Sequence, residues 1–110
     1  MTPHNIFSAL PKAAPGEIIE SILKTDQFTL KRIISTGQAT PPEEWYDQDD
    51  DEWCILLSGS AGLRFADEAQ VVVLKAGDYL HIPAHKRHQV AWTEADQPTV
   101  WLALHYPPGK

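Results

Sequence analysis

A carboxylate and a histidine border short β-type runs in the middle of the chain. Glu52 directly precedes the apolar residues 53–57, and His88 begins a second run that ends at residue 93. Alternate residues of a strand share a face, so Glu52, Cys54 and Leu56 would point to one side. A carboxylate that enters an apolar interior needs a cation, a hydrogen-bond donor or a proton. The two residues therefore predict either a metal site or a metal-free pocket in which they bind each other or water.

The spacing around both residues resembles two motifs of the cupin superfamily. The end of the first motif, G-x5-H-x-H-x3/4-E-x6-G, is matched by Glu52 and Gly59. The second motif, G-x5-P-x-G-x2-H-x3-N, is matched by Gly77, Pro83 and His88. The resemblance covers most of the chain and implies an all-β fold, a single-domain antiparallel β-barrel or jelly roll, also described as a double-stranded β-helix. It also implies that the barrel holds one divalent metal ion and handles a small molecule.

The chain departs from the family at both histidines of the first motif. With the three-residue spacing these positions hold Tyr46 and Gln48, and with the four-residue spacing they hold Trp45 and Asp47. The metal-ligand set that the resemblance implies is therefore His88, Glu52, Gln48 and Tyr46. An amide oxygen and a phenol are weaker ligands for iron, zinc, manganese or nickel, so a metal-free site stays open. Asp47 is the substitute ligand if a one-residue bulge turns it inward.

The second motif departs from the family at two further positions. His85 replaces the glycine, in a loop that follows Pro83, and could serve as an acid-base group at the mouth of the barrel. Trp92 replaces the asparagine. By strand alternation Trp92 shares the inward face with His88, so it is expected to form an apolar wall of the pocket.

Two more residues are candidates for the pocket. Cys54 shares a face with Glu52, so its thiol either faces the cavity or serves as a small buried apolar group. His105 lies in the last expected strand, which in this family faces the cavity. A structural role is the alternative for both residues.

Short runs separated by turns predict the strands. Residues 28–35 alternate, with Phe28, Leu30 and Ile34 on one side and Thr29 and Lys31 on the other. Eight to ten such runs, with turns every eight to twelve residues, predict an antiparallel sandwich or barrel of the jelly-roll type. Residues 17–24 suit a helix or a strand by spacing alone, and the resemblance favours a strand. Prolines punctuate residues 1–16, which are predicted to form an arm, while residues 17–110 form the barrel domain.

Composition narrows the class of protein. A chain of 110 residues fits one domain with one core. The net charge of -6 repels phosphate backbones, so nucleic acid is not an expected partner. No apolar run approaches the ~18 residues that a membrane helix needs. The first residues lack the pattern of a secretory signal, so a cytoplasmic location is the default expectation.

Three functions are consistent with these features. The first is a divalent-metal-dependent enzyme that acts on a small polar or anionic metabolite. The alternative is a non-catalytic binding or sensory protein with a metal-free site, which the missing histidines favour. A structural or interaction role is the third, because four tryptophans and the apolar residues on both faces of 53–57 would suit a homodimer. Fold alone does not decide among them.

Overall fold

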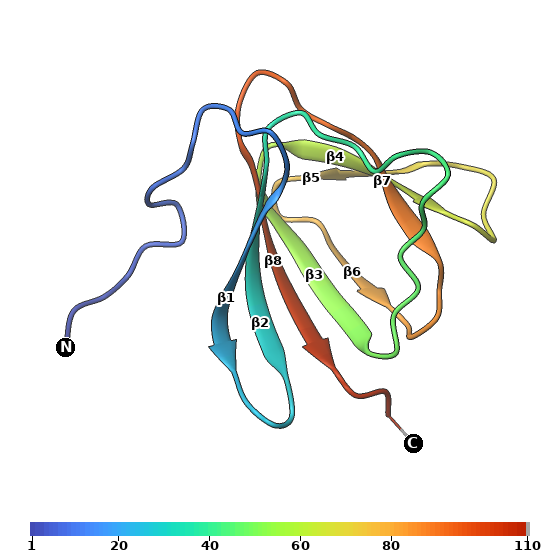
Figure 1. Cartoon of the computed structure of the whole chain (residues 1–110), viewed down its shortest axis with the longest axis horizontal. Coiled ribbons are helices and arrows are strands. Elements are labelled where there is room, and N and C mark those ends of the chain that lie inside the picture. The colour runs from blue at the N-terminus through green and yellow to red at the C-terminus, as the bar shows by residue number, and fades with distance from the viewer. Residues whose placement is uncertain (110) are drawn as a thin grey trace.

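The computed structural model describes residues 1–109, which form eight β-strands and, within that range, no helix (Figure 1). The strands are β1 (Ile18–Lys24), β2 (Thr29–Ser35), β3 (Asp51–Ser58), β4 (Ser60–Phe65), β5 (Val72–Lys75), β6 (Tyr79–Ile82), β7 (His88–Thr93) and β8 (Thr99–Tyr106). No helix in the described part of the chain could therefore cross a bilayer.

Two antiparallel sheets pack face to face. The larger sheet has the order β1-β2-β8-β3-β6, and the smaller has the order β5-β4-β7. Every pairing between neighbouring strands is antiparallel. The predicted all-β, antiparallel barrel of one domain is thus confirmed, and residues 18–24 form a strand as the resemblance implied.

The core lies between the two sheets and follows strand alternation. In β3, Cys54 and Leu56 are buried on the inner face, and Ile55 between them is only partly buried. Trp101 and Ala103 of β8 join them from the same sheet. The smaller sheet contributes Leu63 and its neighbours on the facing side. Glu52 lies on the inner face of β3, as the resemblance implied, and is only 9% exposed.

A register shift in the smaller sheet moves Trp92 out of the barrel, which differs from the predicted pocket wall. Leu63 of β4 pairs with Val90, but Gly62 pairs with Trp92, so Ala91 is an extra residue in β7. Such a bulge reverses the alternation that follows it. The Trp92 indole packs over Gly62, where a Cβ atom would collide with it, and the side chain is 38% exposed. The sequence positions of His88 and Trp92 therefore do not place them on one face.

The segment before β1 lies outside the two sheets (Figure 1). The Arg32 guanidinium in β2 donates to the carbonyl oxygens of Ile6 and Ser8, at 3.0 and 2.7 Å. The amide of Gln38 donates to the carbonyl oxygen of Ala14 at 2.8 Å. These contacts tie the segment to the barrel although it contributes no strand.

Candidate functional site

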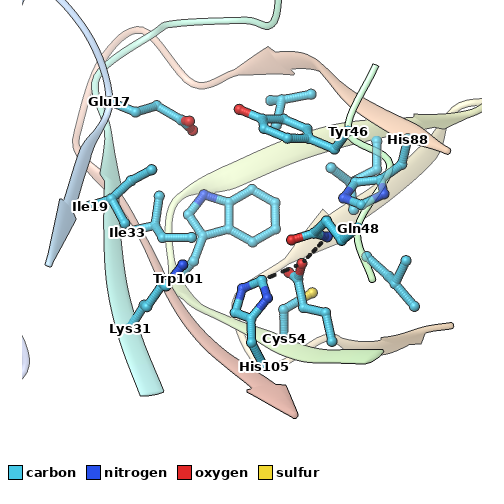
Figure 2. Close-up of a pocket in the computed structure, with 14 residues that line it drawn as sticks. Glu17, Ile19, Lys31, Ile33, Tyr46, Gln48, Cys54, His88, Trp101 and His105 are labelled. Atoms are coloured by element: carbon cyan, nitrogen blue, oxygen red, sulfur yellow. Dashed lines mark hydrogen bonds and ion pairs between the residues drawn. The ribbon is translucent and has the colours of Figure 1, made fainter. Parts of the chain in front are cut away.

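A cavity of about 140 Å³ lies between the sheets, and its wall is mostly apolar. Ile33, Leu63 and Val90 belong to this wall, together with the indole of Trp101. Figure 2 shows the polar side chains of Gln48, His88 and His105 on one side of the cavity, together with the thiol of Cys54. Glu52 also lines the cavity, next to Gln48 and His105. An apolar cavity with a few convergent polar groups is typical of a small-molecule site.

One side chain donates a hydrogen bond to Glu52, and a second lies close to it. The amide nitrogen of Gln48 donates to its Oε1 atom at 3.1 Å. Nε2 of His105 lies 3.7 Å from the same oxygen, because the two residues face each other in the β3–β8 pairing. That separation is longer than a hydrogen bond. Burial lowers the pKa of His105, and the nearby Glu52 charge opposes this only in part, so the imidazole is neutral near pH 7.

His88 enters the cavity from the start of β7. Its Nδ1 atom lies 3.0 Å from the carbonyl oxygen of Lys86, which only accepts hydrogen bonds. In the neutral ring Nδ1 therefore carries the proton, and Nε2 remains as an acceptor. Backbone hydrogen bonds of 2.8 and 3.1 Å join His88 to Tyr46, and their ring centroids lie 5.5 Å apart. The loop before β3 is thus fixed against β7.

Tyr46 presents its ring to the cavity, but its hydroxyl points away from Glu52. Figure 2 shows the phenol oxygen on the side of Glu17. Burial, and then the charge of Glu17, raise the pKa of Tyr46, so the phenol stays protonated. The structure therefore places Tyr46 beside His88 without directing its oxygen toward the Glu52 carboxylate.

The side chains as placed do not fit a resident metal ion. Among residues 1–109, no three His, Cys, Asp or Glu side chains are grouped so that they could hold one. Gln48 turns its amide nitrogen, which is a donor and no ligand, toward Glu52. Of the four ligands that the resemblance implied, Glu52 and His88 remain with a ligand atom available to the cavity. Two ligands are fewer than zinc sites in proteins use, and His105, although it lies close to Glu52, does not complete a group of three with them.

His85 and Asp47 lie outside the cavity and bind each other. Nδ1 of His85 is 2.7 Å from Oδ1 of Asp47, and its Nε2 is 3.5 Å from Oδ1 of Asp49. The His85 backbone nitrogen also donates to the carbonyl oxygen of Gln48 at 2.8 Å. We call these contacts of His85 with Asp47 and Asp49 the outer clamp. The clamp faces solvent, since the His85 side chain is 63% exposed. It turns Asp47 outward, away from the position of a substitute ligand, while Gln48 points inward.

The clamp predicts a pH response of His85. The hydrogen bond to Asp47 raises the pKa of His85 above its ordinary value. A raised pKa means that the contact stabilises the fold below the unfolded-state pKa and is lost as the pH rises through the folded-state value. We expect the His85 ring signal in an NMR titration to move to a lower pKa in Asp47→Asn. His81 is the internal control, and an unchanged His85 titration would contradict the clamp.

The Cys54 thiol faces Glu52 and is expected to be unreactive. It is 1% exposed, and burial, followed by the charge of Glu52, raises the pKa of Cys54 to about 12. Because the thiolate is the reactive form, iodoacetamide should leave the folded protein unmodified at pH 8 and alkylate it fully in denaturant. Mass spectrometry measures both states, and rapid alkylation of the folded protein would contradict this account of the cavity.

Sequence reasoning missed several residues of the cavity. Lys31 and Ile33 line the cavity from β2. Alternation correctly separated Lys31 from Leu30 and Ile34, but it did not indicate that the side with Lys31 faces the cavity. Trp101 lies two residues before Ala103 and four before His105, so strand alternation in β8 was a signal that could have identified it. Glu17, just before β1, had no comparable signal.

Comparisons with known proteins support this fold. The family model of the cupin domain matches residues 32–105. A protein from Ralstonia eutropha JMP134, described as a candidate mannose-6-phosphate isomerase, is 46% identical with a TM-score of 0.94, and the match covers 97% of this chain and 99% of that one. No curated protein is significantly similar in sequence.

Two more distant structures share the fold alone. A cupin superfamily protein from Desulfitobacterium hafniense DCB-2 has a TM-score of 0.71 at 18% identity, over 86% of this chain and 81% of that one. An RmlC-like cupin with a double-stranded β-helix from Methanocaldococcus jannaschii has a TM-score of 0.71 at 15% identity, over 90% and 87%. With the family model matched across most of the barrel, the chain belongs to the cupin family.

Proposed function

We propose that the protein binds one small molecule in the barrel cavity without a resident metal ion. The observation that carries the proposal is the hydrogen bond from Gln48 to Glu52 inside a mostly apolar cavity. A buried carboxylate must be paired, and here an amide does what a cation would otherwise do. This favours the binding or sensory function over the metal-dependent enzyme.

The polar side of the cavity can recognise hydrogen-bonding groups of a ligand. Gln48 fixes the orientation of Glu52, whose carboxylate has further lone pairs for a ligand O–H or N–H. Nε2 of His88 is a second acceptor, and the neutral His105 ring offers either a donor or an acceptor according to its tautomer. A ligand with one or two donors directed at this side would satisfy them.

The metal-dependent enzyme remains the competing hypothesis. Its main support is the 46% identical protein from Ralstonia eutropha, whose description as a candidate isomerase concerns that protein. Elemental analysis of the purified, untagged protein separates the two hypotheses. We expect far less than one metal ion per chain in the purified protein, and the same result after incubation with iron, zinc, manganese or nickel. Near-stoichiometric metal that is lost in both Glu52→Ala and His88→Ala would overturn the metal-free proposal.

A thermal-shift screen of small metabolites tests the binding function itself. Ligand-induced stabilisation is expected to be the same with and without a chelator, because no metal takes part. Gln48→Ala should weaken the response, since Glu52 then loses the donor that orients it. Asp47→Asn, outside the cavity, is the matched control. Stabilisation that a chelator abolishes would favour the metal-dependent alternative.

The predicted homodimer is a proposal that the edge strand β1 supports. Ile19, Ile22 and Leu23 on this strand are 56, 48 and 51% exposed, and β1 is the outermost strand of the larger sheet. Exposed apolar edges pair with other chains unless charge or a cover prevents it. We expect Ile22→Lys to shift the protein from dimer to monomer in light scattering. Val73→Lys, an exposed site on β5, is the control, and a monomeric wild type would contradict the dimer.

A further inference from the structure

The indole nitrogen of Trp101 is a buried donor without an acceptor. The residue is 5% exposed, and Nε1 has no hydrogen-bond partner among residues 1–109. Buried donors in folded proteins are nearly always paired, so an unpaired one calls for an acceptor from outside the chain. Trp101 lines the cavity, and Figure 2 shows its nitrogen on the side of Ile33 and Glu17, away from Gln48 and His105.

The backbone around Trp101 keeps the indole in this position. Strand β8 lies between β2 and β3, and Trp101 pairs with Ile33 on one side and Leu56 on the other. A residue fixed by two neighbouring strands cannot withdraw its side chain to the surface without breaking both pairings. Both partner side chains are apolar and offer no acceptor. The acceptor is therefore expected from a molecule in the cavity.

The charges around the cavity argue against an anionic ligand. Two carboxylates, Glu17 and Glu52, line it, and Lys31 is the single ammonium group that residues 1–109 contribute to its wall. With two carboxylates, one ammonium group and a neutral His105 ring, the wall does not favour negative charge. A phosphate or carboxylate would have to enter a largely apolar space without a net positive charge to pair it, which is unfavourable. The acceptor that meets Trp101 is therefore expected to belong to an uncharged group.

The cavity size limits the ligand further. An engineered cavity of roughly 150 Å³ holds benzene, so about 140 Å³ suits one six-membered ring with a small substituent. We infer that the ligand is a small uncharged molecule whose carbonyl or ether oxygen accepts a hydrogen bond from Trp101 Nε1. This inference rests on the proposed binding function and names the ligand class for the same cavity.

A matched pair of probes tests the hydrogen bond. Cyclohexanone and methylenecyclohexane have nearly the same shape, but only the ketone has an acceptor. We would titrate both into protein with ¹⁵N-labelled tryptophan and follow the indole N–H signals. The ketone is expected to shift the Trp101 signal more than the hydrocarbon does. The preference for the ketone is the dissociation constant of the hydrocarbon divided by that of the ketone. In Trp101→Phe, this ratio should fall by about 3- to 10-fold, as expected for the loss of one neutral hydrogen bond.

Trp53→Phe is the control variant. Trp53 lies on the outer face of β3 with its ring centroid 5.5 Å from that of Tyr79, so its replacement should leave the ratio unchanged. Cyclohexanecarboxylate is the charged probe and should bind more weakly than cyclohexanone. Tighter binding of the carboxylate would overturn the uncharged class.

The outcomes separate the inference from the proposed function. If neither neutral probe binds the wild-type protein, the binding function of the cavity fails. If both bind, but the ketone has no greater effect on the Trp101 signal and the ratio is unchanged in Trp101→Phe, only the hydrogen bond is wrong. If Trp101→Phe does not fold, the wild-type protein still tests the hydrogen bond, because the ketone must shift the Trp101 N–H signal more than the hydrocarbon does.

Discussion

Alanine at Gly59 is expected to destabilise the fold by roughly 3–4 kcal/mol, the sum of a left-handed backbone and a collision. Gly59 joins β3 to β4 with a φ of +84°. A Cβ atom built there would lie 2.8 Å from the Cα atom of Thr99 and would also collide with its Oγ1 atom. Because Thr99 is completely buried, it has no space into which it could move.

Gly77→Ala is the matched control for this substitution. Gly77 also has a positive φ, +97°, but nothing lies within 4 Å of a Cβ atom built there. Only the backbone strain applies, so its loss should be about 1–2 kcal/mol. Urea denaturation of both variants measures the difference. Equal losses of stability in the two variants would show that the contact with Thr99 has no steric effect, which would contradict the short distances to Thr99.

These glycines illustrate how much of the fold the sequence predicts. Gly59 and Gly77 were identified by motif spacing, and the structure shows the physical reason, since both need a φ that other residues rarely adopt. Alternation within β3 correctly predicted that Glu52 and Cys54 share a face, and the resemblance implied that Glu52 faces the interior, where the structure places both. Such local patterns work because a strand repeats every two residues whatever its partners are.

The features that sequence reasoning missed depend on pairing between distant segments. The extra residue at Ala91 exists only relative to β4, so nothing near Trp92 indicated that it would point outward. The approach of His105 to Glu52 follows from the register of β8 against β3. The contact between Asp47 and His85 joins two different loops, so nothing near either residue in the sequence indicated it. Each case needed the tertiary structure, because one residue of register changes which side chains share a face.

Removal of the Gln48 amide, which donates a hydrogen bond to Glu52, is expected to lower the free energy of unfolding by the second largest amount. Gln48→Leu leaves the buried carboxylate without its 3.1 Å hydrogen bond, since His105 is 3.7 Å away and neutral. An unsatisfied buried group costs about 1–3 kcal/mol, and more when it is charged, so we expect a loss of about 3 kcal/mol.

Glu52→Leu should behave in the opposite way. Replacing a buried charge by an apolar side chain is often neutral or stabilising, so this variant should keep or exceed the wild-type stability while it loses ligand binding. In the double variant Gln48→Leu/Glu52→Leu, most of the loss seen in Gln48→Leu alone should disappear, because no carboxylate remains to be paired. Urea denaturation of the four proteins gives this coupling directly.

Additive losses would mean that Gln48 stabilises the barrel by packing and that the carboxylate is satisfied by something other than the amide. Strong coupling, together with a Glu52→Leu variant more stable than the wild type, would mean that the fold tolerates a charge it would be more stable without, which is expected of a residue retained for binding.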